Sequence, residues 1–227
     1  MSGAMEHGGF VLERWVSIDF PVIVLGGGGH ALVLIEMLEL LNIEIIGVVV
    51  RDPGAAHIHG YPVIGNDDAV FGYRPESVRL VNAIGSTRQP HARRRLFTRF
   101  KTSGYTFARL IHPAAVISSK AVIGEGVQVM AGAVLQPGCR IGDNVIVNTR
   151  AVIEHDSVIG SHTHISPGAV LAGGVTVGET VHVGAGATVI QGITIGDNSL
   201  VAAGAVVVSN VPQDATVMGI PAKEVQS

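Results

Sequence analysis

An aliphatic residue returns at every sixth position from Ile117 to Val207, and this period constrains the fold more than any other feature of the chain. A helix needs apolar residues at i, i+3, i+4 and i+7, and a half-buried strand needs strict alternation, so neither explains a period of six. Uninterrupted hexapeptides are typical of a parallel β-helix. The sixteen matching positions are Ile117, Ile123, Val129, Leu135, Ile141, Val147, Ile153, Ile159, Ile165, Leu171, Val177, Val183, Val189, Ile195, Val201 and Val207.

These hexapeptides predict a triangular prism with three short strands in each coil of eighteen residues. The aliphatic residues point inward, successive coils stack at about 4.8 Å, and the matches make up about five coils. A small or β-branched residue stands two positions before each aliphatic residue, and glycine often follows it. An ordinary β-sandwich is also rich in valine, isoleucine and glycine, but it does not require this register.

A second pattern precedes the repeats. Residues 21–25 (PVIVL) are apolar, residues 26–29 are all glycine, residues 30–41 have helical apolar spacing, and residues 43–50 are apolar again. This order predicts a βαβ unit in a parallel sheet covered on both faces. The other elements expected here are strands at 63–64, 77–84 and 105–109, an N-cap at Asn66 and a helix at 88–102.

The glycine run fits the G-x-G-x-x-G/A nucleotide fingerprint at Gly26, Gly28 and Ala31. In that motif the amides at the helix N-terminus hold phosphate, and an acidic residue about twenty positions later accepts a ribose hydroxyl, a role that suits Asp52. A glycine run that only makes a tight turn is the alternative. Because about ninety residues make one mononucleotide-binding half, a nucleotide-linked substrate fits better than a whole dinucleotide.

Composition excludes several classes of function. The formal charge of −3 provides no basic field for nucleic acid. Mean hydropathy is +0.44, but the longest apolar stretch, 31–41, contains two glutamates and is too short to span a bilayer, so no membrane partner is expected. The basic run Arg88–Lys101 is interpreted as a solvated helix face rather than a phosphate site. Residues 1–20 form an expected extension without a signal peptide, which places the protein in the cytoplasm.

Ionisable residues cluster within the repeats at Glu154, His155 and Asp156. A neutral imidazole can take a proton near pH 7, and an adjacent carboxylate from Asp156 or Glu154 can orient it. Residues eighteen apart stack, so Gly173 is expected over His155, where its amide can bind an oxyanion. His164 lies half a coil from His155, so the two are expected to meet only across a subunit interface. A solvated surface histidine is the alternative.

Several motifs together resemble the bacterial sugar O/N-acyltransferases, which include sialic acid O-acetyltransferases and N-acetyltransferases of UDP- or GDP-linked 4-amino-4,6-dideoxy sugars. The resemblance covers about residues 21–225 and rests on GGGGHA (26–31), GYPVIG (60–65), AIG (83–85), LIHP (110–113), Asn148-Thr, Glu154-His155-Asp156 and the hexapeptides. It implies a Rossmann-like nucleotide-sugar-binding α/β domain at 21–110 and a left-handed parallel β-helix acyltransferase domain at 111–227. It also implies a homotrimer with acetyl-CoA between neighbouring subunits.

The resemblance further implies residue roles. His155 is the expected general base and Asp156 its partner, with Glu154 beside them and Asn148 lining the site. The acetyl-CoA contacts implied are His164, Gly173, Ala185, Ala203 and Lys223, and the nucleotide-sugar contacts are Gly28, Gly29, His30 and Asp52. One departure is Arg51-Asp52, where many relatives carry two acidic residues.

The expected activity is acetyl-CoA-dependent N-acetylation of the nucleotide-linked amino sugar. O-acetylation of a sialic-acid-like sugar and a non-catalytic nucleotide-binding trimeric scaffold are the alternatives. A zinc site is disfavoured, and no metal is expected: His162 and His164 form a close pair, but the upstream histidine used by β-helical carbonic anhydrases is missing at the required distance.

Overall fold

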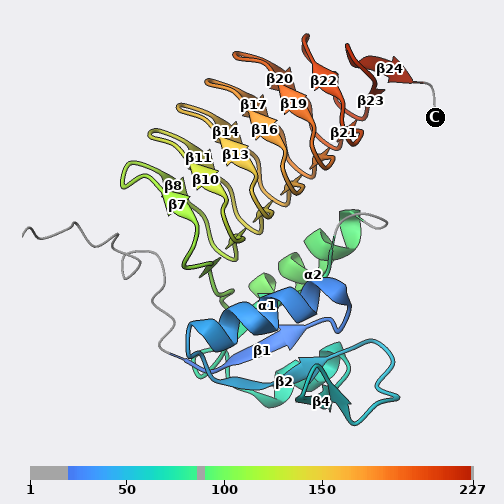
Figure 1. The fold of residues 1–227 in the computed structure, drawn as a ribbon. Coiled ribbons are helices and arrows are strands. Elements are labelled where there is room, and N and C mark those ends of the chain that lie inside the picture. Colours follow the sequence, from blue (N-terminus) through green and yellow to red (C-terminus); the bar gives the residue numbers. More distant parts are fainter. Residues whose placement is uncertain (1–19, 86–89, 226–227) are drawn as a thin grey trace, which may run out of the picture.

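The computed structural model describes residues 20–85 and 90–225, which form an α/β sheet region followed by a left-handed β-helix (Figure 1). The expected extension at 1–20, apart from Phe20, and the expected helix start at Arg88 lie outside the described residues. Within the described ranges, no helix combines the length and apolar character needed to cross a membrane.

The first region is a five-stranded sheet in the order β3-β4-β2-β1-β5, in which only the β3–β4 pair is antiparallel. Helix α1 packs on one face, and α2 packs on the other together with a 3-10 helix, η2. The element bounds are β1 (Val22–Leu25), α1 (Gly29–Leu40), β2 (Ile45–Val49), β3 (His57–Ile58), β4 (Tyr61–Gly65), η2 (Asp67–Gly72), β5 (Arg79–Asn82) and α2 (Pro90–Thr102). Asn66 caps η2 as expected, because its side chain accepts from the Asp68 amide.

The prediction of a strand at 105–109 is wrong. Only an isolated bridge between Phe107 and Leu80 forms there, and Leu110 already pairs with the β-helix. The chain passes between two sheets within a few residues, so no regular strand has room to extend.

The β-helix has three faces of short parallel strands, which appear as stacked coils in Figure 1. The β7–β22 face contains β7 (Val116–Ile117), β10 (Val134–Leu135), β13 (Val152–Ile153), β16 (Val170–Leu171), β19 (Thr188–Val189) and β22 (Val206–Val207). The β8–β20 face contains β8 (Val122–Ile123), β11 (Arg140–Ile141), β14 (Val158–Ile159), β17 (Thr176–Val177) and β20 (Thr194–Ile195). The β6–β24 face contains β6 (Leu110–Ile111), β9 (Gln128–Val129), β12 (Ile146–Val147), β15 (His164–Ile165), β18 (His182–Val183), β21 (Leu200–Val201), β23 (Thr216–Met218) and an antiparallel β24 (Lys223–Val225).

The predicted inward residues form one apolar core. Fifteen of the sixteen aliphatic positions are buried, and Ile117 in the first coil is partly buried against the same cluster. Partners in neighbouring strands are eighteen residues apart, as between Ile153 and Leu171. The hexapeptide period therefore predicted both the core and the register of this region correctly.

Glycine follows many of the inward aliphatic residues because the next coil lies too close for a side chain. A Cβ at Gly160 would lie 2.4 Å from the Gly178 carbonyl carbon, and one at Gly184 would lie 2.4 Å from the Ala203 amide nitrogen. These neighbours are backbone atoms of the next coil, so they cannot move without separating the two coils.

The two regions share a core. Met130 and Ile146 of the β-helix belong to the same apolar cluster as α1 residues such as Leu34. On the other side of the sheet, Phe97 of α2 lies edge-on to the His162 ring with centroids 5.5 Å apart. The sheet region therefore rests on the β6–β24 face and on the turns that lead into it.

Replacing Gly160 with alanine should lower the free energy of unfolding by about 1–3 kcal/mol or more, because the added methyl overpacks the coil stack. Gly72→Ala is the matched control, since nothing lies within 4 Å of a Cβ there. Urea unfolding followed by circular dichroism measures both variants. Equal stability of the two would contradict the close approach of the coils.

Candidate functional site

His155 and Asp156 occupy the turn between β13 and β14, and their side chains are 64% and 75% exposed. His155 Nδ1 lies 3.0 Å from Asp156 Oδ2. Asp156 adopts a left-handed backbone conformation with φ of 60°, in which its amide donates to the Pro137 carbonyl. The carboxylate thus holds one ring nitrogen and leaves Nε2 available to a ligand.

Glycines in the neighbouring coils make room for this pair. A Cβ at Gly173 would lie 2.5 Å from His155 Nε2, and a Cβ at Gly138 would lie 2.5 Å from Asp156 Oδ1. The half-buried Gly173 amide makes no hydrogen bond among the described residues, whereas the next amide, of Gly174, donates to the His155 carbonyl. A free backbone donor therefore lies beside the free ring nitrogen, as the register predicted.

Glu154, the other carboxylate next to His155, does not contact the imidazole ring through a hydrogen bond. Its amide donates to the Leu171 carbonyl, and its partly buried side chain makes no hydrogen bond to His155. Of the two carboxylates considered from sequence, Asp156 is the one that holds the imidazole.

Asn148 and His164 form a second cluster, away from His155. His164 lies in β15 on the β6–β24 face, and Asn148 lies in the turn after β12 of the same face. Asn148 Oδ1 accepts from the Thr149 amide, so Nδ2 donates to His164 Nε2 at 3.1 Å and leaves the ring proton on Nδ1. The His164 ring also lies edge-on to that of His182, with centroids 5.0 Å apart. Burial, reinforced by the positive potential of His182, His30 and Arg93, lowers the pKa of His164 to about 2. This ring is therefore neutral at physiological pH.

The expected acetyl-CoA contacts lie along two different edges of the prism. Gly173 and His155 are on the edge between the β7–β22 and β8–β20 faces, whereas Ala185 and Ala203 stack on the edge after the β6–β24 face. Lys223 is exposed on β24. One chain therefore does not gather these residues into a single continuous site.

At the expected nucleotide end, helix α1 begins with an open N-terminus. Gly28 is the N-cap and provides no side-chain cap, and nothing lies within 4 Å of a Cβ at Gly28 or Gly29. His59, which the sequence reasoning missed, lies above the loop with Nε2 3.2 Å from the Gly27 carbonyl oxygen. The amides of the first turn are thus free to bind an anion. Asp52 is exposed, and its side chain makes no hydrogen bond or ion pair among the described residues.

A buried polar network ties this loop to the β-helix. His30 Nε2 lies 2.8 Å from Gln128 Oε1, and Gln128 Nε2 donates to the Asn82 carbonyl at 2.8 Å. The Asn82 side chain then donates to Asn144, whose own amide group lies 3.0 Å from His162 Nδ1.

Arg93 completes the network, and for this residue the solvated-face interpretation of the basic run is wrong, although Arg94, Arg95 and Arg99 are exposed as expected. Its side chain is 1% exposed and donates to three carbonyls, those of Asn82, Ile84 and Asn144. Burial lowers its pKa to about 9, which leaves it protonated near neutral pH. A buried cation held by backbone carbonyls thus joins the sheet that carries the glycine loop to the β-helix.

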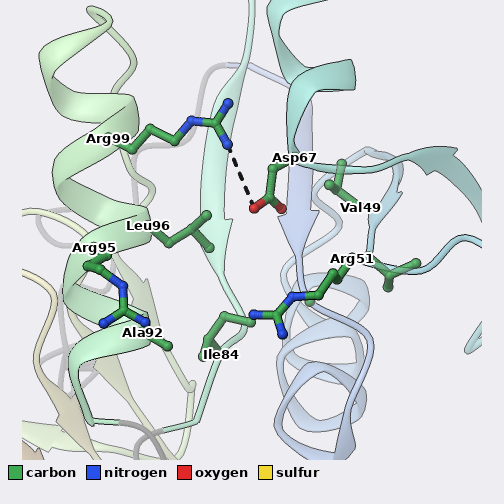
Figure 2. Close-up of a pocket in the computed structure, with 10 residues that line it drawn as sticks. Val49, Arg51, Asp67, Ile84, Ala92, Arg95, Leu96 and Arg99 are labelled. Carbon is green, nitrogen blue, oxygen red and sulfur yellow. Dashed lines mark ion pairs between the residues drawn. The ribbon is translucent and has the colours of Figure 1, made fainter.

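A cavity of about 210 Å³ lies beside the glycine loop on the α2 side of the sheet (Figure 2). Arg95 and Arg99 of α2 face it, so these two members of the basic run line a pocket and are not simply a solvated face. Asp52 is not among its lining residues, which are Gly26, Val49, Val50, Arg51, Asp67, Ile84, Ala92, Arg95, Leu96 and Arg99. Across residues 20–85 and 90–225, no three histidine, cysteine or acidic side chains are grouped to hold a metal ion.

Replacing Arg93 with methionine should lower the free energy of unfolding by about 2–4 kcal/mol, because it strands buried carbonyls and separates the two regions. Arg94→Met is the matched control, since Arg94 is exposed and makes only a 3.5 Å contact to Thr180. Thermal and urea unfolding compare the variants. Similar losses in both would contradict the structural role of Arg93.

Stability should fall as the pH drops below about 6.5, the pKa of an unfolded histidine, because the folded state keeps His164 neutral. Between pH 7 and pH 5 this one residue should account for up to about 2 kcal/mol of lost stability. His164→Gln should flatten the pH dependence by that amount, whereas His91→Gln, at an exposed position, should not. Urea unfolding at both pH values provides the measurement, and an unchanged slope in His164→Gln would refute the assignment.

Two family models match the chain. Bacterial transferase hexapeptide (six repeats) matches residues 120–155, 138–173 and 156–191, and PglD N-terminal domain matches residues 21–100. The first model matches part of the β-helix, and the second matches most of the sheet region.

Solved structures of similar chains agree with these matches. PerB from Caulobacter crescentus, solved with CoA and GDP-perosamine, is 40% identical with a TM-score of 0.86, covering 92% of this chain and 99% of PerB. The acetyltransferase domain of PglB from Neisseria gonorrhoeae is 36% identical with a TM-score of 0.85, covering 91% of this chain and 100% of the PglB domain.

A curated protein is also similar to this chain. UDP-N-acetylbacillosamine N-acetyltransferase of Bacillus subtilis is 39% identical over 114 residues, which are 48% of this chain and about half (51%) of that protein. The chain therefore belongs to the sugar acyltransferase family with hexapeptide repeats.

Proposed function

We propose that this protein is an acetyl-CoA-dependent N-acetyltransferase that acts on the amino group of a UDP- or GDP-linked 4-amino-4,6-dideoxy sugar. The observation that carries the proposal is the pairing of His155 with Asp156 on one side and the unbonded Gly173 amide on the other. PerB and the PglB domain, which were solved with CoA and acetyl-CoA respectively, support the choice of cosubstrate. A nucleotide sugar and acetyl-CoA would meet in the cytoplasm.

In the proposed reaction, the sugar amine attacks the thioester carbonyl of acetyl-CoA. His155 Nε2 removes the proton from the amine as the C–N bond forms, and Asp156 stabilises the imidazolium. The Gly173 amide donates to the oxyanion of the tetrahedral intermediate. When the C–S bond breaks, the CoA sulfur leaves and takes the proton from His155, so the products are the acetamide and free CoA.

A homotrimer would complete the site. The proposed contacts of acetyl-CoA lie on two edges of the prism, and neighbouring subunits can bring one edge of each together. Asn148 and the neutral His164 would then line the site opposite His155, with Ala185, Ala203 and Lys223 along the CoA arm. The open N-terminus of α1, at Gly28, Gly29 and His30, would bind the diphosphate of the sugar nucleotide, and Asp52 would reach the ribose.

His155→Ala should lower kcat about a hundredfold or more, because the amine then loses its proton acceptor. Asp156→Asn should cost about tenfold, since the ring remains but its orientation and imidazolium are less well supported. Initial rates of CoA release with a nucleotide-linked amino sugar measure both.

Glu154→Gln is the matched comparison, because it removes the same charge one residue away from the ring but leaves the His155–Asp156 contact intact. It should cost less than Asp156→Asn. A loss of less than about threefold in His155→Ala would remove this residue as the general base.

A further inference from the structure

We propose that the arginine-lined pocket beside the glycine loop binds the base of the sugar nucleotide and selects guanine. The pocket is defined by Arg51, Arg95, Arg99 and Asp67 above apolar walls that include Ile84 (Figure 2). This inference rests on the proposed function, because it names the nucleotide of the same substrate. It also accounts for the basic face of α2, which the proposed acetyl transfer does not use.

The pocket lies where an open α/β sheet binds its ligand. Gly26 follows β1 and Ile84 follows β5, and these adjacent strands mark the point where the strand order reverses. Ligands of such sheets bind at the carboxyl ends of the strands at this switch point. Gly26 also adjoins the open N-terminus of α1, so one nucleotide can place its diphosphate on α1 and its base in the pocket.

The volume of the cavity suits one part of a ligand. Pockets that enclose whole small molecules have volumes of about 300–1,000 Å³, and this cavity has about 210 Å³. Val49, Leu96 and Ile84 provide apolar surface for a flat ring.

Two guanidinium groups in the pocket lack partners of their own. Among the described residues, neither Arg51 nor Arg95 makes a hydrogen bond or ion pair, and Figure 2 shows them approaching Ile84 from opposite sides. Arg99 differs, because it pairs with Asp67 at 3.9 Å and with Asp68. The pocket thus holds free, forked donors that match two adjacent acceptors on a ligand.

Asp67 provides the opposite kind of group. Within the part of the chain that the structure describes, only its Oδ2 is paired, with Arg99, and its side chain is 41% exposed. This carboxylate adds an acceptor to a lining whose other charged groups are three arginines. A ring that offers both acceptors and donors can use the arginine donors and the Asp67 acceptor together, whereas an ionised phosphate has no donor for the carboxylate.

Guanine presents this pattern on its two edges. Its O6 and N7 are adjacent acceptors that arginine binds in a bidentate manner, and its N1–H and N2–H are adjacent donors for a carboxylate. Uracil has a single N–H between two carbonyls, and adenine and cytosine place an amino donor where guanine and uracil have a carbonyl. We assign the arginine donors to the O6/N7 edge and Asp67 to the N1/N2 edge.

Calorimetric titration of the full-length protein with GDP, IDP, UDP and ADP tests this assignment. GDP should bind at least about tenfold more tightly than IDP, which lacks only the N2 amino group, and more tightly still than UDP or ADP. Asp67→Asn should reduce the GDP preference over IDP to less than about threefold, and Arg95→Gln should weaken GDP binding about tenfold.

Asp68→Asn is the control for the loss of an Arg99 partner, because Asp68 pairs with Arg99 but does not line the pocket. It should keep the wild-type preference for GDP over IDP. UDP binding as tightly as GDP, or an unchanged preference in Asp67→Asn, would overturn the guanine assignment. If UDP bound and Arg95→Gln weakened it, the proposed function would stand with another base. If CoA bound but no nucleoside diphosphate did, the proposed substrate class would fail as well.

Discussion

The pairing of each strand with the strand eighteen residues later is the constraint on which the rest of the structure depends. Parallel ladders stack every turn residue on its counterpart in the next coil, and the coils approach so closely that many stacked positions admit only glycine. The same stacking leaves space for His155 beneath Gly173 and for Asp156 above Gly138. The orientation of the proposed base and the exposure of the neighbouring amide are therefore consequences of how the core is built, and no insertion from outside the repeats is needed to position them.

A second constraint joins the sheet region, with its proposed nucleotide site, to this scaffold. Arg93 is buried where the sheet region meets the β-helix, and its Nε and Nη1 donate to carbonyls of Asn144 and Asn82, one from each region. Through Asn82 and Gln128 the same network reaches His30 at the start of α1. The proposed nucleotide site is thus held in a fixed relation to the coils that carry the proposed reacting groups, which matters because a misplaced amine would not reach the thioester.

Much of this arrangement could be predicted from the sequence, because the repeat converts sequence spacing directly into spatial contact. The period of six identified the inward residues, and a step of eighteen placed Gly173 over His155. The β-helix needed only local pattern, whereas the environment of α2 depends on contacts with distant residues. Nothing in a run of arginines distinguishes Arg93, whose partner Asn144 is 51 residues away, from the exposed Arg94. The pocket was missed for the same reason, since Arg51 lies in the loop after β2, Asp67 in η2 and Arg95 in α2.

The central claim is that the acetyl group is transferred to a sugar nitrogen by groups held in this register. Mass spectrometry of the product formed from acetyl-CoA and a nucleotide-linked 4-amino-4,6-dideoxy sugar, before and after mild alkaline hydroxylamine, tests it most directly. An amide resists this treatment and an ester does not, so the account predicts an acetylated sugar nucleotide that survives it. An acetyl group released by hydroxylamine, or no acetylated sugar nucleotide at all, would contradict the account.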